Sequence, residues 1–128
     1  MSRQLISANR PWEKIVGYSR AVRVGDTIEV SGTAAAGPDG TILSPGDVYG
    51  QTRDALRIIG EALAEGGASF EDVVRTRVYL TDAATWQEAG RAHGEVFSEI
   101  RPANTTLAVS GFVDPAILVE IEVTAVIG

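Results

Sequence analysis

Residues 117–127, ILVEIEVTAVI, decide the fold, because their side chains alternate in character with the period of a β-strand. One row of alternate residues is wholly apolar: Val119, Ile121, Val123 and Ala125. The other row is mixed: Glu120, Glu122, Thr124 and Val126. The first row predicts a face buried in a core. The second is too charged at one end for a sealed core and too apolar at the other for open water, so it predicts a subunit interface that contains a polar cleft.

Strand signals also occur elsewhere in the chain. Residues 18–24 and 27–31 form an expected hairpin around the tight turn Gly25-Asp26. Residues 72–80 and 104–110 alternate as well, and a short strand at residues 4–7 is weakly signalled. Together with the segment above, these strands predict one mixed sheet of about six strands.

Helical periodicity marks the stretches between these strands. Asp47 is a suitable N-cap for a helix that runs to about Glu65 and ends at Gly66-Gly67. Thr81 or Asp82 caps a second helix, which Pro102 stops. Two helices can cover only one face of such a sheet, so the sequence predicts a single α+β domain over residues 1–128.

Composition restricts the classes of function. The chain contains no cysteine, which excludes disulfides, thiolate nucleophiles and cysteine-based metal sites. No metal-binding cluster, phosphate-cradling loop or cofactor motif is present, so neither a metal nor a cofactor is expected. The net charge is −6 and Lys14 is the one lysine, so nucleic acid is not an expected partner. The polar amino terminus and the lack of a long apolar run predict a cytoplasmic protein that does not enter the membrane.

The chain resembles the RidA/YjgF family in three segments that occur in order: GYSRAVRVGDTIEVSG (17–32), VVRTRVYLTD (73–82) and RPANTTLAV followed by LVEIEVTAV (101–126). The resemblance implies a chorismate-mutase-like fold and a homotrimer built around a central barrel of sheets. It also implies three clefts at the subunit interfaces, each for a small molecule. Well-studied members bind small 2-imino or 2-keto acids in these clefts and hydrolyse the imine to a ketone and ammonia.

The resemblance also assigns candidate site residues. The cleft tyrosine of the family matches Tyr18, and the turn whose backbone lines the pocket matches Ser31-Gly32. The cleft glutamate matches Glu120, which in the deaminase interpretation positions or deprotonates the attacking water. A structural role for Glu120, paired with an arginine across the interface, is the alternative.

One position departs from the family. Pro102 and Ala103 match, but the carboxylate-binding arginine that follows them is Asn104 here. Arginine holds a carboxylate with two parallel charge-assisted hydrogen bonds, whereas asparagine offers a neutral amide. Asn104 and Thr106 point the same way along their strand, and they suit a neutral, hydrogen-bonding ligand better than an acid.

Three hypotheses about function follow. The first is a water-dependent deaminase that acts on a small imine or enamine, with Glu120 handling the water. The second is a trimer that binds a small metabolite without converting it. Because Asn104 stands in place of the carboxylate-binding arginine, this second hypothesis has nearly the same weight as the first. The third, an RNA-cleaving enzyme, has little support from the charge pattern.

The remaining polar residues have structural interpretations. His93, the only histidine, lies on the apolar stripe of the second helix and is interpreted as a packed side chain. Gly90 and Gly94 share a helix face, which predicts close packing against the sheet. Arg75 and Arg77 could offer a carboxylate another cation, but interface ion pairs are the preferred interpretation.

Overall fold

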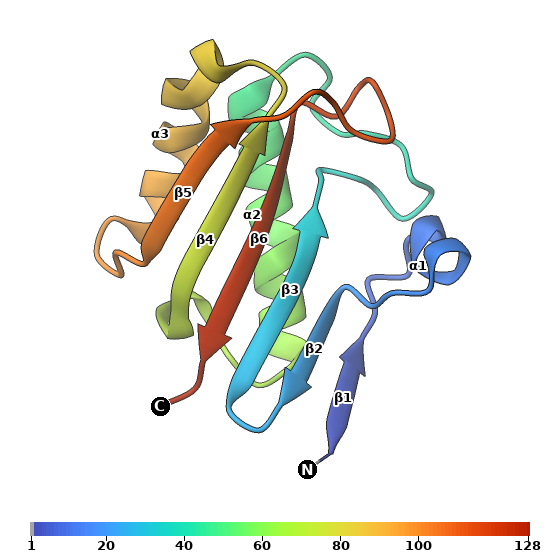
Figure 1. Cartoon of the computed structure of the whole chain (residues 1–128), viewed down its shortest axis with the longest axis vertical. Coiled ribbons are helices and arrows are strands. Elements are labelled where there is room, and N and C mark those ends of the chain that lie inside the picture. The colour runs from blue at the N-terminus through green and yellow to red at the C-terminus, as the bar shows by residue number, and fades with distance from the viewer. Residues whose placement is uncertain (1) are drawn as a thin grey trace.

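The computed structural model describes residues 2–128, which form one mixed sheet with helices packed against it (Figure 1). The strands are β1 (Arg3–Ile6), β2 (Ala21–Val24), β3 (Thr27–Thr33), β4 (Val73–Leu80), β5 (Ala103–Ala108) and β6 (Val119–Val126). The helices are α1 (Pro11–Val16), α2 (Val48–Glu65) and α3 (Trp86–Phe97), with single 3-10 turns at Phe70–Asp72 and Ala83–Thr85.

The sheet has six strands in the order β1-β2-β3-β6-β4-β5. All neighbouring strands are antiparallel except β4 and β5, which are parallel. The α+β class, the mixed sheet and its approximate strand number are therefore confirmed. The first strand of the predicted hairpin starts later than expected, because residues 18–20 precede β2 instead of forming its beginning.

β6 lies inside the sheet, and its apolar row forms the centre of the core. Val119, Ile121, Val123 and Ala125 are each at most 1% exposed. Burying a side chain of valine or isoleucine size contributes roughly 1.5–3 kcal/mol, so this row alone is a large part of the driving force for folding. The strand alternation read from the sequence therefore corresponds to a real division between core and open face.

α2 and α3 cover the core face of the sheet, as predicted (Figure 1). The Asp47 side chain caps α2 by accepting a hydrogen bond from the Gly50 N–H at 2.9 Å. Leu56, Ile59 and Leu63 follow at helical spacing and are almost completely buried.

α1 was not expected from the sequence. It is only six residues long and begins at Pro11, and its Ile15 and Val16 are 80% and 72% exposed. Because Ile15 and Val16 face solvent, it lacks the stripe that predicts a packed helix. The buried Glu13 holds it in place, accepting hydrogen bonds from Ser7 Oγ at 2.8 Å and the Ala8 N–H at 3.0 Å.

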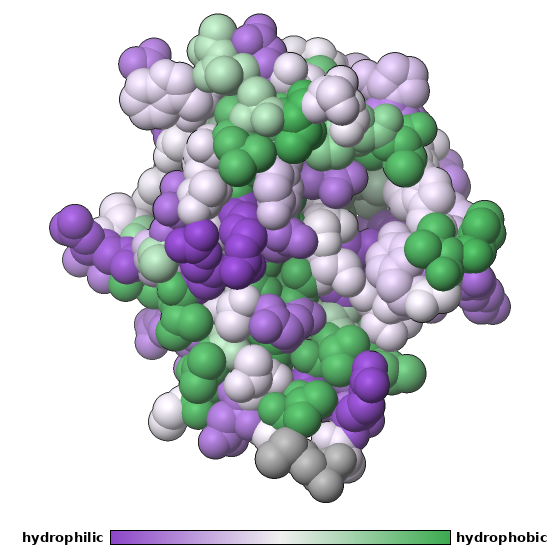
Figure 2. Space-filling view, in the orientation of Figure 1, coloured by the Kyte–Doolittle hydropathy of each residue, from purple (hydrophilic) through white to green (hydrophobic). Residues whose placement is uncertain are grey.

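No helix of the chain covers the second face of the sheet over residues 2–128, and this open face carries the mixed row of β6 (Figure 1). Apolar and polar patches lie side by side on it (Figure 2). Polar pairs include Tyr79 Oη, which donates to Glu122 Oε1 at 2.5 Å, and Thr124 Oγ1, which donates to Glu29 Oε1 at 2.6 Å. Leu107 and Val126 are 43% and 42% exposed.

Candidate functional site

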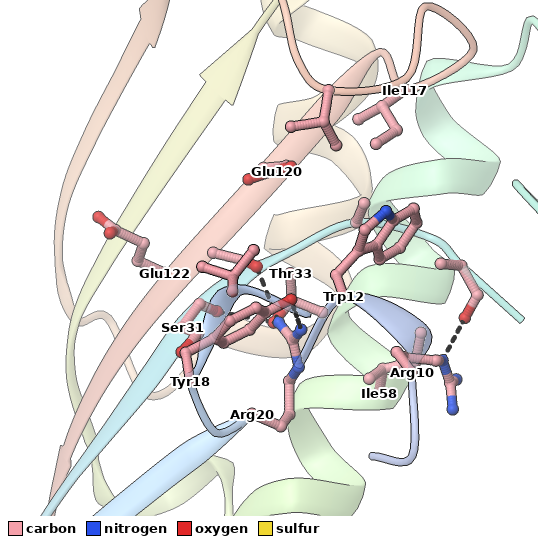
Figure 3. A pocket seen from close by; sticks show the side chains of 15 residues that line it. Arg10, Trp12, Tyr18, Arg20, Ser31, Thr33, Ile58, Ile117, Glu120 and Glu122 are labelled. Atoms are coloured by element: carbon pink, nitrogen blue, oxygen red, sulfur yellow. Dashed lines mark hydrogen bonds between the residues drawn. The ribbon is translucent and has the colours of Figure 1, made fainter. Parts of the chain in front are cut away.

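A pocket of about 390 Å³ opens where β3, β6 and the segment before β2 meet α1 and the loop before β6 (Figure 3). We call it the glutamate pocket. Apolar side chains form much of its wall: Trp12, Val16, Ile58, Val113 and Ile117. Polar side chains line the remainder, and Tyr18, Ser31, Gly32 and Glu120 are all among the lining residues. Four of the six candidate site residues thus come together in one cavity.

Arg20 organises the polar side of this pocket. It is only 4% exposed, and its Nη1 donates to the Gly32 carbonyl at 2.8 Å and to Thr33 Oγ1 at 2.9 Å. Its Nε–H has no hydrogen-bond partner within residues 2–128, and no carboxylate of that range lies within ion-pair distance. Burying a guanidinium without a carboxylate partner costs free energy. Because no carboxylate neutralises it within residues 2–128, the positive charge of Arg20 acts electrostatically on the groups around the pocket.

Tyr18 is oriented by Arg20. Arg20 Nη2 donates to Tyr18 Oη at 3.2 Å, and the guanidinium carbon lies 5.4 Å from the centre of the phenol ring. Because the phenol oxygen accepts this bond, its own proton remains available for a ligand. Tyr18 can therefore act as a hydrogen-bond donor in the pocket.

Ser31 and Gly32 have mainly structural duties in the single chain. Ser31 Oγ donates to the Ser19 carbonyl at 2.7 Å, which uses its proton. A Cβ at Gly32 would lie 2.8 Å from Glu120 Oε1, closer than real Cβ contacts. Glycine at this position therefore makes room for the Glu120 carboxylate.

Glu120 is partly buried and makes no hydrogen bond to any residue that the structure describes. Burial raises the pKa of its carboxyl; the positive charge of Arg20 opposes this shift, and the negative charge of Glu122 adds to it. A carboxylate with an increased proton affinity and free oxygens can hold a water molecule and accept its proton.

Asn104 and Thr106 do not line the glutamate pocket of their own chain. They pair with Thr76 and Val78 across the parallel β4–β5 ladder, and those two β4 side chains face the helices. Asn104 and Thr106 therefore line a second pocket of about 180 Å³, between the edge strand β5 and Trp86, Gly90 and His93 of α3. We call this the edge pocket.

The structure confirms one interpretation of α3 residues and corrects another. His93 is packed against Phe97, with ring centres 4.6 Å apart, but its Nε2 also lies 2.9 Å from Thr76 Oγ1. Gly90 and Gly94 were expected to pack closely against the sheet, and this is wrong. A Cβ built on either glycine meets no atom within 4 Å, and the space beside Gly90 belongs to the edge pocket.

The sequence interpretation missed part of the site. Trp12 and Val16 come from α1, which had no helical signal, and no sequence pattern indicated that Arg20 organises the pocket. Arg75 donates to Thr105 Oγ1 at 2.5 Å, and neither Arg75 nor Arg77 forms an ion pair within residues 2–128.

Over residues 2–128, no three His, Asp or Glu side chains gather as they would around a metal ion. None of the helices described has the length and apolar character needed to cross a membrane.

Comparisons with known proteins identify the family. The family model described as Endoribonuclease L-PSP matches residues 8–127. A Mycobacterium tuberculosis crystal structure, described as a member of the YjgF/YER057c/UK114 family, is 44% identical; the match covers 98% of this chain and 100% of that one, with a TM-score of 0.88. An uncharacterised Streptomyces coelicolor protein is 42% identical over 120 residues, or 94% of this chain and 89% of the relative. A Mus musculus protein named 2-iminobutanoate/2-iminopropanoate deaminase is 33% identical over 126 residues, or 98% of this chain and 93% of the relative. The chain belongs to the RidA/YjgF family.

Proposed function

We propose that the protein is a homotrimer that hydrolyses a small imine or enamine to a ketone and ammonia. The observation that carries this proposal is the state of Glu120: its carboxylate is partly buried, makes no hydrogen bond to residues 2–128 and has a raised pKa, in a pocket that also holds the Tyr18 hydroxyl. The deaminase name of the mouse relative supports the same reaction class.

The reaction needs one base and one donor, and the glutamate pocket has both. Glu120 accepts a proton from water as the water oxygen forms a bond to the imine carbon, while the Tyr18 O–H stabilises the imine nitrogen. The tetrahedral intermediate then collapses. Glu120 returns its proton to the nitrogen, then takes the proton of the new hydroxyl group and passes it to the same nitrogen as the C–N bond breaks, so that the C=O bond forms and ammonia leaves. An enamine enters the same sequence after it tautomerises to the imine.

A second copy of the chain completes the site in this proposal. The glutamate pocket includes Glu120 and Glu122 of the uncovered sheet face, whereas the edge pocket lies on the helix side of the strand that ends the sheet. Exposed Leu107 and Val126 on the open face favour burial against a neighbour. A cyclic trimer would set the edge pocket of one subunit beside the glutamate pocket of the next, so that Asn104 and Thr106 contact the ligand.

The ligand is proposed to be neutral at the end that meets Asn104. No side chain lining the edge pocket is an arginine or lysine, so this pocket offers a carboxylate no permanent cation. The same observation favours the second candidate function, a family member that holds a small metabolite without catalysis. A measurement of turnover distinguishes the deaminase function from the binding function.

Mixed trimers test the proposed function. Glu120→Gln removes the base, and Gly90→Phe fills the edge pocket from α3, where an added Cβ meets no other atom within 4 Å. Each variant alone should be inactive in ammonia release from a panel of small neutral and acidic imines. Equal amounts of the two variants are then unfolded and refolded together, so that trimers contain both kinds of subunit. About a quarter of the interface sites combine an intact glutamate pocket from one subunit with an intact edge pocket from its neighbour, and about a quarter of the wild-type activity should therefore return.

If the refolded mixture stays as inactive as the separate variants, the site is not shared between subunits. If wild-type protein releases no ammonia but binds imine-like ligands, the binding function replaces the catalytic one.

The pH dependence of turnover should respond in opposite directions to two charge changes. Ionised Glu120 is needed as the base, so kcat/KM should fall as the pH drops through its pKa, which burial raises above the ordinary 4.5. Glu122→Gln removes a negative charge that raises this pKa, so the acid limb should move to lower pH. Arg20→Gln removes a positive charge that lowers it, so the limb should move to higher pH. Limbs that stay in place in both variants would contradict Glu120 as the base.

A further inference from the structure

The polar side chains of the edge pocket form one continuous chain of hydrogen bonds. Thr106 Oγ1 lies 3.1 Å from Asn104 Oδ1, and Asn104 Nδ2 lies 3.0 Å from Thr76 Oγ1. Thr76 Oγ1 lies 2.9 Å from His93 Nε2. Thr76 is fully buried, so the chain runs from the exposed edge strand into the core and ends on the histidine.

Counting protons along this chain fixes the state of His93. Thr76 accepts a hydrogen bond from Asn104, and its single hydroxyl proton then needs an acceptor. His93 Nε2 is the acceptor within reach, which requires that the ring carries its proton on Nδ1. With Asn104 Nδ2 as the donor to Thr76, a proton on Nε2 would give the buried Thr76 hydroxyl two donors and no acceptor for its own proton, at a cost of about 1–3 kcal/mol.

This direction determines what the edge pocket presents to a ligand. Thr106 gives its proton to Asn104, so Thr106 offers the pocket only lone pairs. Asn104 keeps one unused N–H and therefore offers a donor. A group with an N–H beside a carbonyl matches this pattern, whereas a carboxylate has no donor for Thr106.

We propose that His93 is the specificity-determining residue of the edge pocket: by accepting from Thr76, it holds Asn104 and Thr106 in the arrangement that takes a neutral amide group and rejects a carboxylate. The part of this assignment that concerns the substrate rests on the proposed function. The hydrogen-bond direction itself does not, because it is a property of the single chain.

The surroundings of His93 support a neutral ring. Burial lowers the pKa of His93, and no charged group contributes to that shift. The other residues lining the edge pocket are uncharged on α3, β4 and β5 alike. Arg91 and Glu95 of the same helix turn toward Tyr49 of α2: Arg91 lies 3.8 Å from the centre of its ring, and Glu95 accepts from its hydroxyl at 2.7 Å.

Nitrogen-15 NMR tests the direction without any variant. His93 is the only histidine of the chain, so the two ring nitrogens of labelled protein need no assignment between residues. At pH 7.5 we expect the proton on Nδ1 and a lone pair on Nε2. A proton on Nε2 would reverse the chain and overturn the proposal, whatever the protein catalyses.

A matched pair of probes tests the selectivity. Propionamide should shift the Asn104 side-chain and His93 ring signals of labelled protein, whereas propionate at equal concentration should not. Thr76→Val breaks the chain and should weaken propionamide binding about three- to tenfold. Thr52→Val, an equally buried threonine of α2 that donates to the Val48 carbonyl, is the control and should change nothing.

Equal binding of the two probes, binding of neither, or equal losses in the two valine variants would refute the role given to His93. A failure of imine turnover with the expected probe results would instead refute only the proposed function.

Discussion

Replacing Glu120 with glutamine is expected to lower imine turnover by about 10²–10⁴-fold, because general base catalysis typically contributes that factor. Glutamine has nearly the same size as glutamate, so it fits into the space that Gly32 leaves beside position 120. Ammonia release at saturating substrate measures the loss. Glu29→Gln on β3 is the matched control, since Glu29 lies on the same sheet face but outside the glutamate pocket.

Full activity in Glu120→Gln would show that the carboxylate is structural. The alternative raised by the sequence, a glutamate paired with an arginine across the interface, would then predict a loss of stability in place of a loss of rate.

Asn104→Arg is expected to strengthen binding of small 2-keto acids by about 10–100-fold, because a guanidinium forms two charge-assisted hydrogen bonds with a carboxylate. Asn104 is exposed on the edge strand of the single chain, so the longer side chain can be accommodated there. Isothermal titration with pyruvate measures the gain, and Asn104→Gln is the control for side-chain length.

Tight binding of pyruvate to the wild-type protein would contradict this prediction. The buried Arg20, which has no carboxylate partner within residues 2–128, would then be the cation to replace next. Mass in solution should be checked in the same samples, because an unpaired arginine at an interface can weaken assembly.

Alternation along single strands predicted much of the fold. The rows of β6 separate core from open face as the sequence indicated, and capping by Asp47 marks the start of α2. α1 was not predicted from the sequence, because a six-residue helix with exposed Ile15 and Val16 has no amphipathic stripe.

The arrangement of the site was harder to predict. Strand parity correctly put Asn104 and Thr106 on one side of β5, but it cannot say which side of the sheet that is. The pairing of Asn104 with the core-facing Thr76 settles the side, and sequence spacing gives no information about this pairing. The resemblance placed Asn104 in one cleft with Glu120, and within a single chain the two residues line different pockets.

The proposed shared cleft depends on the assembly, so the mass of the protein in solution is the most direct measurement. Light scattering behind size-exclusion chromatography, at micromolar concentration and 150 mM salt, should give three times the 13.5 kDa of one chain. A mass of 13.5 kDa would contradict the trimer and leave Asn104 and Glu120 in separate pockets with no common ligand.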